Sequence, residues 1–141
     1  MYSYKGHCQC HAVKVLMELT YPLCEYSARK CDCDFCMQRH ISYLSDPGGK
    51  LVVSSKCKLD VQKQGSDQAE FLTCPMCHDV ITASIPYGDK RIGALNTNLL
   101  DEYHKLKSPT VVSPKALSAE DKLARWQTVW TPVFITTESV K

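Results

Sequence analysis

Three groups of closely spaced cysteines are the part of this sequence best suited to chemistry. They are Cys8-Gln9-Cys10, Cys31-Asp32-Cys33-Asp34-Phe35-Cys36 and Cys74-Pro75-Met76-Cys77. Thiols this close together form disulfides or bind a metal ion. Nine cysteines in all is an odd number, which fits a framework made only of disulfides badly. The first residues lack the apolar stretch of a signal peptide. We therefore expect a cytoplasmic chain, where cysteine pairs act as metal ligands.

The two outer pairs have the spacing of zinc knuckles. Cys8 and Cys10 with Cys74 and Cys77 supply four thiolates, and a structural zinc ion is held by a closed tetrahedron of four ligands. One shared ion would fasten the N-terminal segment to a distant hairpin, closing a long loop. The alternative is four unrelated buried cysteines. Zinc is preferred over iron because a structural zinc site needs no redox partner.

The central triad, Cys31, Cys33 and Cys36, has a different donor count. Three thiolates leave one position of a zinc ion open, which is the mark of a catalytic site. A substrate thiol bound there is deprotonated at neutral pH and becomes a nucleophile. The alternative is a structural site closed by a fourth side chain, for which His40, Cys24 or Cys57 is available. The spacing alone does not separate these two readings.

Composition limits the classes of protein that this chain can belong to. Its 141 residues, 44% of them apolar, are enough for one domain over residues 1–141 with a core. Small β domains of this size often use a metal ion for stability. A net charge of +2 gives no argument for nucleic acid or a membrane surface as a partner. No apolar run approaches the length of a spanning helix.

Periodicity and turn signals predict the elements that must position the cysteines. Apolar and polar residues alternate over 13–19, which indicates a half-buried strand after the first pair. Further strands are expected over 41–45, 51–53, 58–61, 69–73, 80–85 and 91–95, with a last edge segment over 131–136. Ser118 begins a short helix over 119–126, and residues 29–38 are expected to form a loop leading into a short helix or a turn. The prediction is a mainly β domain, mostly antiparallel, with one or two short helices and Cys74/Cys77 at a hairpin tip.

The order and spacing of the three cysteine groups resemble one known family. Gly6-His7-Cys8-Gln9-Cys10, Cys31-Asp32-Cys33-Asp34-Phe35-Cys36, Phe71-Leu72-Thr73-Cys74-Pro75-Met76-Cys77 and Gly93-Ala94-Leu95 are similar to motifs of the glutathione-dependent formaldehyde-activating enzymes. That family includes the centromere protein V relatives. The resemblance implies an Mss4-like β-tent of small antiparallel sheets, a structural zinc on the outer pairs and a catalytic zinc on the triad. It also implies carbon–sulfur lyase chemistry with glutathione as co-substrate.

The chain departs from the family at positions beside the metal sites. His11 and His78 stand where the family has a glycine after each outer pair, and glycine there would relax the backbone of a knuckle. After the triad, Met37, Gln38 and Ile41 replace the usual basic residues and glycine. A changed surface beside the open zinc position indicates a substrate other than formaldehyde.

We therefore expect a zinc-dependent carbon–sulfur lyase or transferase acting on a glutathione adduct of a small electrophile. Arg29, Lys30 and Arg39 bracket the triad and are the candidates for binding substrate carboxylates. His40 is a proton shuttle, a metal ligand or an ordinary loop residue. The alternative function is a zinc-stabilised binding module with both ions closed. A methionine sulfoxide reductase would need a reactive cysteine after the last pair, and Cys77 is the final cysteine. The oligomeric state, including a homodimer, stays open.

The remaining cysteines, histidines and tryptophans have simpler expected roles. Cys24 and Cys57 are expected to be buried as small apolar residues. Trp126 and Trp130 are expected in the core or at its rim. His7, like the histidine that follows each outer pair, is expected to support the ligands or lie at the surface, because four sulfurs already fill the ion.

Overall fold

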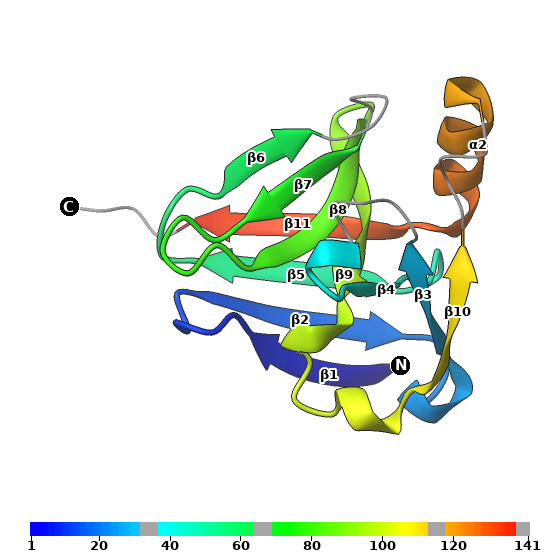
Figure 1. Ribbon diagram of the computed structural model, residues 1–141, viewed down its shortest axis with the longest axis horizontal. Coiled ribbons are helices and arrows are strands. Elements are labelled where there is room, and N and C mark those ends of the chain that lie inside the picture. Colours follow the sequence, from blue (N-terminus) through cyan, green and yellow to red (C-terminus); the bar gives the residue numbers. More distant parts are fainter. Residues whose placement is uncertain (32–36, 64–68, 113–117, 138–141) are drawn as a thin grey trace.

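The computed structural model describes residues 1–31, 37–63, 69–112 and 118–137 and is mainly β (Figure 1). Its strands are β1 (Tyr2–His7), β2 (Val13–Leu19), β3 (Ser27–Cys31), β4 (Ser42–Leu44), β5 (Lys50–Ser55), β6 (Asp60–Lys63), β7 (Glu70–Thr73), β8 (Val80–Tyr87), β9 (Lys90–Asn96), β10 (Lys107–Val112) and β11 (Thr131–Thr137). Helix α2 (Ala119–Val129) and the 3₁₀ turns η1 (Leu23–Glu25), η2 (Thr97–Leu99) and η3 (Tyr103–Lys105) complete the described elements. The mainly β class expected from the sequence is confirmed.

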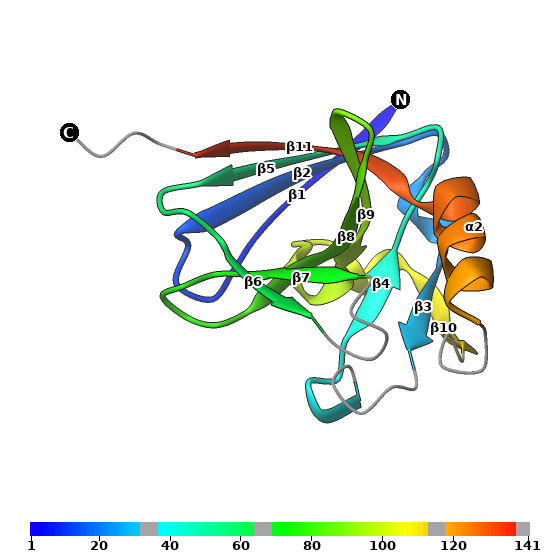
Figure 2. The same ribbon diagram turned by 90° about the horizontal axis from the view of Figure 1, so that it is seen from above.

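The strands form two connected layers. β1, β2, β5 and β11 make one layer, and β11 then pairs with β9 of the second layer. The second layer continues from β9 through β4 and β3 to β10 in one direction and through β8 and β7 to β6 in the other. In Figure 2 the first layer lies along the top of the view, and β6 and β7 lie apart from it below. Most pairings are antiparallel, as predicted, and β10–β3 and β11–β5 are parallel.

The main core lies between these layers and follows from strand alternation. In β2 every second residue from Val13 to Leu19 is buried and the intervening ones are exposed or half-buried. Those inward side chains join Leu51 and Val53 of β5 in a cluster with Ile81 and Leu95 of the second layer. Cys8 and Cys74 belong to the same cluster, so two of the clustered thiols are part of the core.

A second apolar cluster lies under the helix. Ser118 caps α2, its hydroxyl accepting from the backbone N–H of Asp121 at 3.1 Å, which confirms the predicted helix start. The rings of Trp126 and Trp130 stack with centroids 4.7 Å apart, and Trp130 is buried with Tyr43. Both tryptophans therefore pack at the core and its rim, as expected.

The structure corrects two predicted elements. The segment expected to be a loop from residue 29 is strand β3 at its start, since Arg29 and Lys30 pair with Tyr43 and Ser42 of β4. The segment 131–136 does more than form an edge, because Thr131 and Pro132 pair with β9 of the second layer while the residues from Val133 onward pair with β5. Whether a strand lies at the edge or in the interior of a sheet depends on long-range pairing, about which local periodicity gives no information.

In the described residues no helix has both the length and the apolar content that crossing a membrane requires.

Candidate metal centre

The turn between β1 and β2 holds the first pair of cysteines. The backbone N–H of Cys8 donates to the carbonyl of Val13 at 3.0 Å, and the N–H of His11 donates to the carbonyl of Cys8 at the same distance. The N–H of Val13 also donates to the Cys8 sulfur at 3.3 Å. These bonds close a tight turn that carries both thiols, Cys8 and Cys10, at one end of the core.

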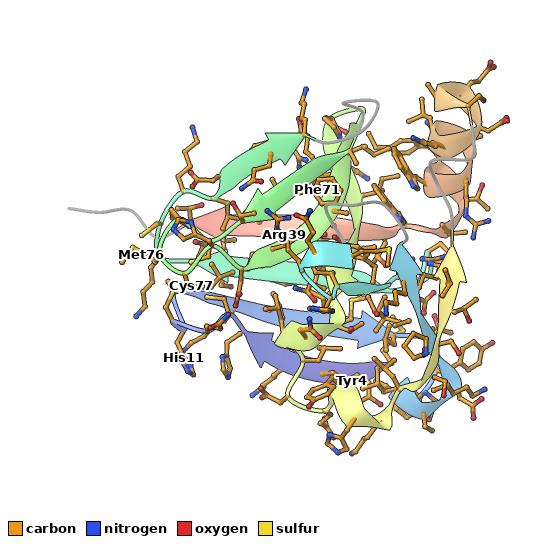
Figure 3. The ribbon with its side chains drawn as sticks, viewed as in Figure 1. Tyr4, His11, Arg39, Phe71, Met76 and Cys77 are labelled. Atoms are coloured by element: carbon orange, nitrogen blue, oxygen red, sulfur yellow. The ribbon has the colours of Figure 1, made fainter. Side chains whose placement is uncertain are left out.

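The hairpin between β7 and β8 repeats this construction. The N–H of Cys74 donates to the carbonyl of Asp79 at 2.9 Å, and the N–H of His78 donates to the carbonyl of Cys74 at 2.9 Å. Cys74 and Cys77 thus sit at a hairpin tip, as the sequence predicted. Figure 3 shows Cys77 and His11 on neighbouring loops at one end of the molecule, although their turns lie far apart in the sequence.

Both turns place a histidine in the left-handed region of backbone space. The φ angle is 64° at His11 and 65° at His78, and His40 has a φ of 54°. A residue other than glycine in this region costs on the order of 1 kcal/mol, and histidine tolerates it better than bulky or branched residues do. Both turns therefore have the backbone geometry that a glycine would adopt there, with a histidine in its place.

The four outer sulfurs converge as a metal site requires. The Sγ atoms of Cys8, Cys10, Cys74 and Cys77 all lie within 4.8 Å of one another. The Cys10 sulfur is 3.6 Å from the sulfurs of both Cys8 and Cys74. A tetrahedral zinc ion with Zn–S bonds of about 2.3 Å separates its sulfurs by about 3.8 Å. The donor set and its spacing therefore fit one zinc ion, and this group can bind a metal.

Electrostatics in this cluster favour a bound cation. Burial raises the pKa of the Cys8 thiol to about 12, and burial also raises the pKa of Cys74. The backbone N–H of Ala12 lowers the pKa of the more exposed Cys10 to about 7. Four thiolates gathered in a partly buried space repel one another, and a divalent cation compensates their charge.

A polar clamp ties the two turns together outside the sulfurs. Asp79 accepts from the backbone N–H of Gln9 at 2.9 Å through Oδ2 and from the Gln9 side chain at 2.8 Å through Oδ1. His7 donates from Nδ1 to the carbonyl of Cys8 at 2.9 Å, and its ring stacks on His11 with centroids 3.8 Å apart. The sequence analysis did not identify Gln9 or Asp79 as site residues. The signal that could have found them is their position, since Gln9 lies inside the first cysteine pair and Asp79 follows the last pair closely.

A cavity of about 340 Å³ lies beside this centre. Its wall includes Cys8 and Asp79 from the two turns, Asn98 from η2, and Arg39 and Ile41 from the segment before β4. Ile41 is buried and Arg39 is exposed. The cavity is thus bounded by residues that follow the central cysteine triad within five positions along the chain.

The other predicted site residues have distinct positions. Residues 32–36 lie outside the described part of the chain, as does the side chain of Cys31, so the predicted triad site stays a prediction. His40 stands between two cavity-lining residues, and its carbonyl accepts from the Asn98 side chain at 3.2 Å. Arg29 and Lys30 lie on β3 and do not line this cavity.

Arg29 has a specific environment on β3. Its guanidinium donates to the Ser45 hydroxyl. Burial, with a smaller contribution from the like charge of Arg125, lowers its pKa.

Among the unclustered cysteines, Cys57 is half-buried but Cys24 is exposed, contrary to expectation, because the short turn η1 buries Leu23 instead.

Comparison with known proteins supports the fold. No protein-family model matches the chain, and no curated protein matches it. The structure is similar to the crystal structure of a Rhodobacter sphaeroides protein from a structural genomics programme, with a TM-score of 0.59 and 23% sequence identity. The match covers 77% of this chain and 99% of that chain. Identity at this level supports the β-rich arrangement alone.

Proposed function

We propose that this chain is a zinc-dependent carbon–sulfur lyase or transferase that acts on the adduct of a thiol, glutathione, with a small electrophile. The observation that carries the proposal is the cavity beside the four-cysteine centre. One of its walls is built by Arg39 and Ile41, which follow Cys36 closely in the sequence. A concave site with a few polar groups is the usual form of a small-molecule site.

The two metal sites have separate roles in this proposal. Cys8, Cys10, Cys74 and Cys77 hold a structural zinc that fixes one end of the core. Cys31, Cys33 and Cys36 would hold a second zinc, which would supply a Lewis acid that lowers the pKa of a substrate thiol.

The chain's own residues position the substrate and move its proton. Arg39 binds a carboxylate of the thiol substrate through paired N–H groups. His40, next in the chain, gives a proton to the carbonyl oxygen of the electrophile while the sulfur–carbon bond forms. The same histidine removes that proton when the bond breaks in the reverse direction. Water in the cavity is the alternative proton carrier.

The experiment adds glutathione to the zinc-loaded protein and follows the zinc X-ray absorption edge and the appearance of an adduct with formaldehyde or another small aldehyde. A changed edge spectrum and adduct formation, both absent in Cys33→Ser, support the enzyme. The variant must keep the circular dichroism spectrum of the parent. No binding and no spectral change would refute the enzyme.

That negative result would favour the second candidate, a zinc-stabilised binding module. The four converging sulfurs of the outer pairs are the observation that favours a module. They would saturate one ion and leave no position on it for a substrate.

A further inference from the structure

The core does not hold the four sulfurs of the metal centre in place equally well. Cys8 and Cys74 are completely buried in the main apolar cluster, and Cys77 is half-buried and packs against it. Cys10 is exposed, so it gains little of that support. Close packing therefore fixes three of the four ligands, and the position of Cys10 depends on other contacts.

Hydrogen bonds within its own turn orient Cys10 only locally. The backbone N–H of Ala12 donates to the Cys10 sulfur, and the N–H of His11 donates to the carbonyl of Cys8 at 3.0 Å. Both bonds lie inside the turn between β1 and β2. A tetrahedral ion bound by both cysteine pairs also needs a fixed distance between this turn and the β7–β8 hairpin.

The Gln9–Asp79 pair is a link between the two turns. Gln9 stands between the two cysteines of the first pair, and Asp79 follows Cys77 by two positions. Asp79 accepts from the backbone N–H of Gln9 at 2.9 Å and from the Gln9 side chain at 2.8 Å, each with a different oxygen. Two bonds to one carboxylate restrain orientation as well as distance. The backbone next to Cys10 is thereby tied to the second turn.

We propose that Asp79 is a positioning residue for the metal ion, because through Gln9 it holds the Cys10 sulfur where all four thiolates can bind one ion. The 3.6 Å separation between the Cys10 and Cys74 sulfurs is the distance that this link maintains. The inference needs a metal ion on the four outer cysteines and does not depend on the catalytic activity proposed above. It assigns to Gln9 and Asp79 a role in metal affinity that the spacing of the cysteines does not indicate.

Two variants remove the link to different degrees. Asp79→Ala removes both hydrogen bonds, whereas Gln9→Ala removes the side-chain bond and leaves the backbone N–H with its acceptor. Loss of a residue that supports a metal ligand typically lowers metal affinity by about 10–100-fold. Because Gln9 is exposed, we expect the lower end of that range, about tenfold for Asp79→Ala and about threefold for Gln9→Ala.

Asp101 offers a matched control for the loss of a negative charge. Its carboxylate lies 3.6 Å from Nε2 of His7, beside the first turn, and that pair includes neither Gln9 nor Asp79. Asp101→Ala therefore removes a carboxylate near the metal centre and leaves the link between the turns intact. We expect it to change the metal affinity by less than about twofold, since exposed ion pairs contribute little.

The test uses the full chain with Cys33→Ser as the common background, so that the triad does not compete for metal. Cobalt(II) is titrated first and followed by its sulfur-to-metal charge-transfer absorption, and zinc affinity is then measured by competition with a chelator. Circular dichroism checks that each variant keeps the parent fold. If Asp79→Ala does not fold, Gln9→Ala takes its place in every comparison, with an expected loss of about threefold.

A double-mutant cycle with Cys10→Ser decides whether Asp79 acts through Cys10. Without the Cys10 sulfur there is no ligand left for the link to position, so Asp79→Ala should then change the affinity by less than about twofold. An equal loss with and without Cys10 would overturn the inference, because Asp79 would then act on the fold as a whole. So would an unchanged affinity in Asp79→Ala, or an equal loss in Asp101→Ala. The lyase proposal is tested separately, with Cys33 intact and glutathione present, so either proposal can fail alone.

Discussion

Loss of the four-cysteine site should destabilise this domain strongly, and Cys74→Ser is the sharpest perturbation. Cys74 lies at the tip of the β7–β8 hairpin and is buried in the main core. Its sulfur is 3.6 Å from that of Cys10, a residue 64 positions away in the sequence. A metal ion bound by both therefore closes a long loop between the first layer and the second.

The magnitude follows from the entropy of that loop. Cross-linking a loop of this length lowers the entropy of the unfolded chain by an amount worth about 4 kcal/mol at room temperature. Most domains have a total stability of about 5–15 kcal/mol, so this is a large fraction. For a chain of this length, with about 2.1 cal/mol/K of unfolding entropy per residue, it corresponds to a fall in melting temperature of roughly 13 °C.

The assay is thermal unfolding followed by circular dichroism, together with metal analysis of each sample. Cys24→Ser is the matched control, because Cys24 is exposed and lies outside the cluster. It should shift the melting temperature by less than about 2 °C. Treating the parent with a strong chelator should reproduce the effect of Cys74→Ser. Equal small shifts in Cys74→Ser and Cys24→Ser, with unchanged zinc content, would refute the reasoning.

Three further outcomes are expected. Metal analysis should find about two zinc ions per chain, and Cys33→Ser should lose one of them while staying folded; a content of one in both proteins would count against the triad site. Gly6→Ala should lower the urea midpoint by the equivalent of about 1–3 kcal/mol, because a Cβ there would lie 2.1 Å from the carbonyl oxygen of Leu99, and an unchanged midpoint would contradict that packing. Burial raises the pKa of Asp46, but hydrogen bonds from Tyr26 and from backbone amides outweigh it and lower the pKa overall. That contribution to stability is complete above the unfolded pKa of about 3.9 and is lost as the pH falls through the lower folded value. Asp46→Asn should therefore destabilise most at pH 7 and least near pH 2, a trend that Asp89→Asn at an exposed site should not show.

The parts of the fold that depend on neighbours in sequence were predictable. Alternation from Val13 to Leu19 gave β2 its correct bounds, because a half-buried strand repeats every second residue. Ser118 identified the start of α2, since a cap acts within one turn. The spacing of Cys74 and Cys77 placed them at a hairpin tip for the same local reason.

The parts of the fold that depend on pairing between distant segments could not be predicted from the sequence. Strand β3 was expected to be a loop, and its parallel partner β10 was not predicted, because neither has a clear alternation of its own. The segment that forms β11 was taken for an edge, but it joins the two layers by pairing with both β5 and β9. Such pairings bring together segments whose relation no local pattern encodes.

The candidate metal centre also has some features that the sequence predicted and others that only the folded structure shows. Ligand chemistry and spacing led directly to the outer cysteine pairs, since a closed tetrahedron of sulfur needs four thiolates in two short turns. The left-handed histidines after each pair could not be foreseen, because only the folded turns show that His11 and His78 adopt the conformation of glycine. Nor did any motif indicate the Gln9–Asp79 clamp.

The sequence by itself determined that this chain is a mainly β domain with cysteine groups spaced to bind metal. Those properties follow from residue type and short-range spacing. Only the tertiary structure decided that sulfurs 64 positions apart converge, and that a cavity opens beside them between the two turns, η2 and the segment leading into β4. A cavity is the space left between elements from different parts of the chain, so it exists only once the layers have packed.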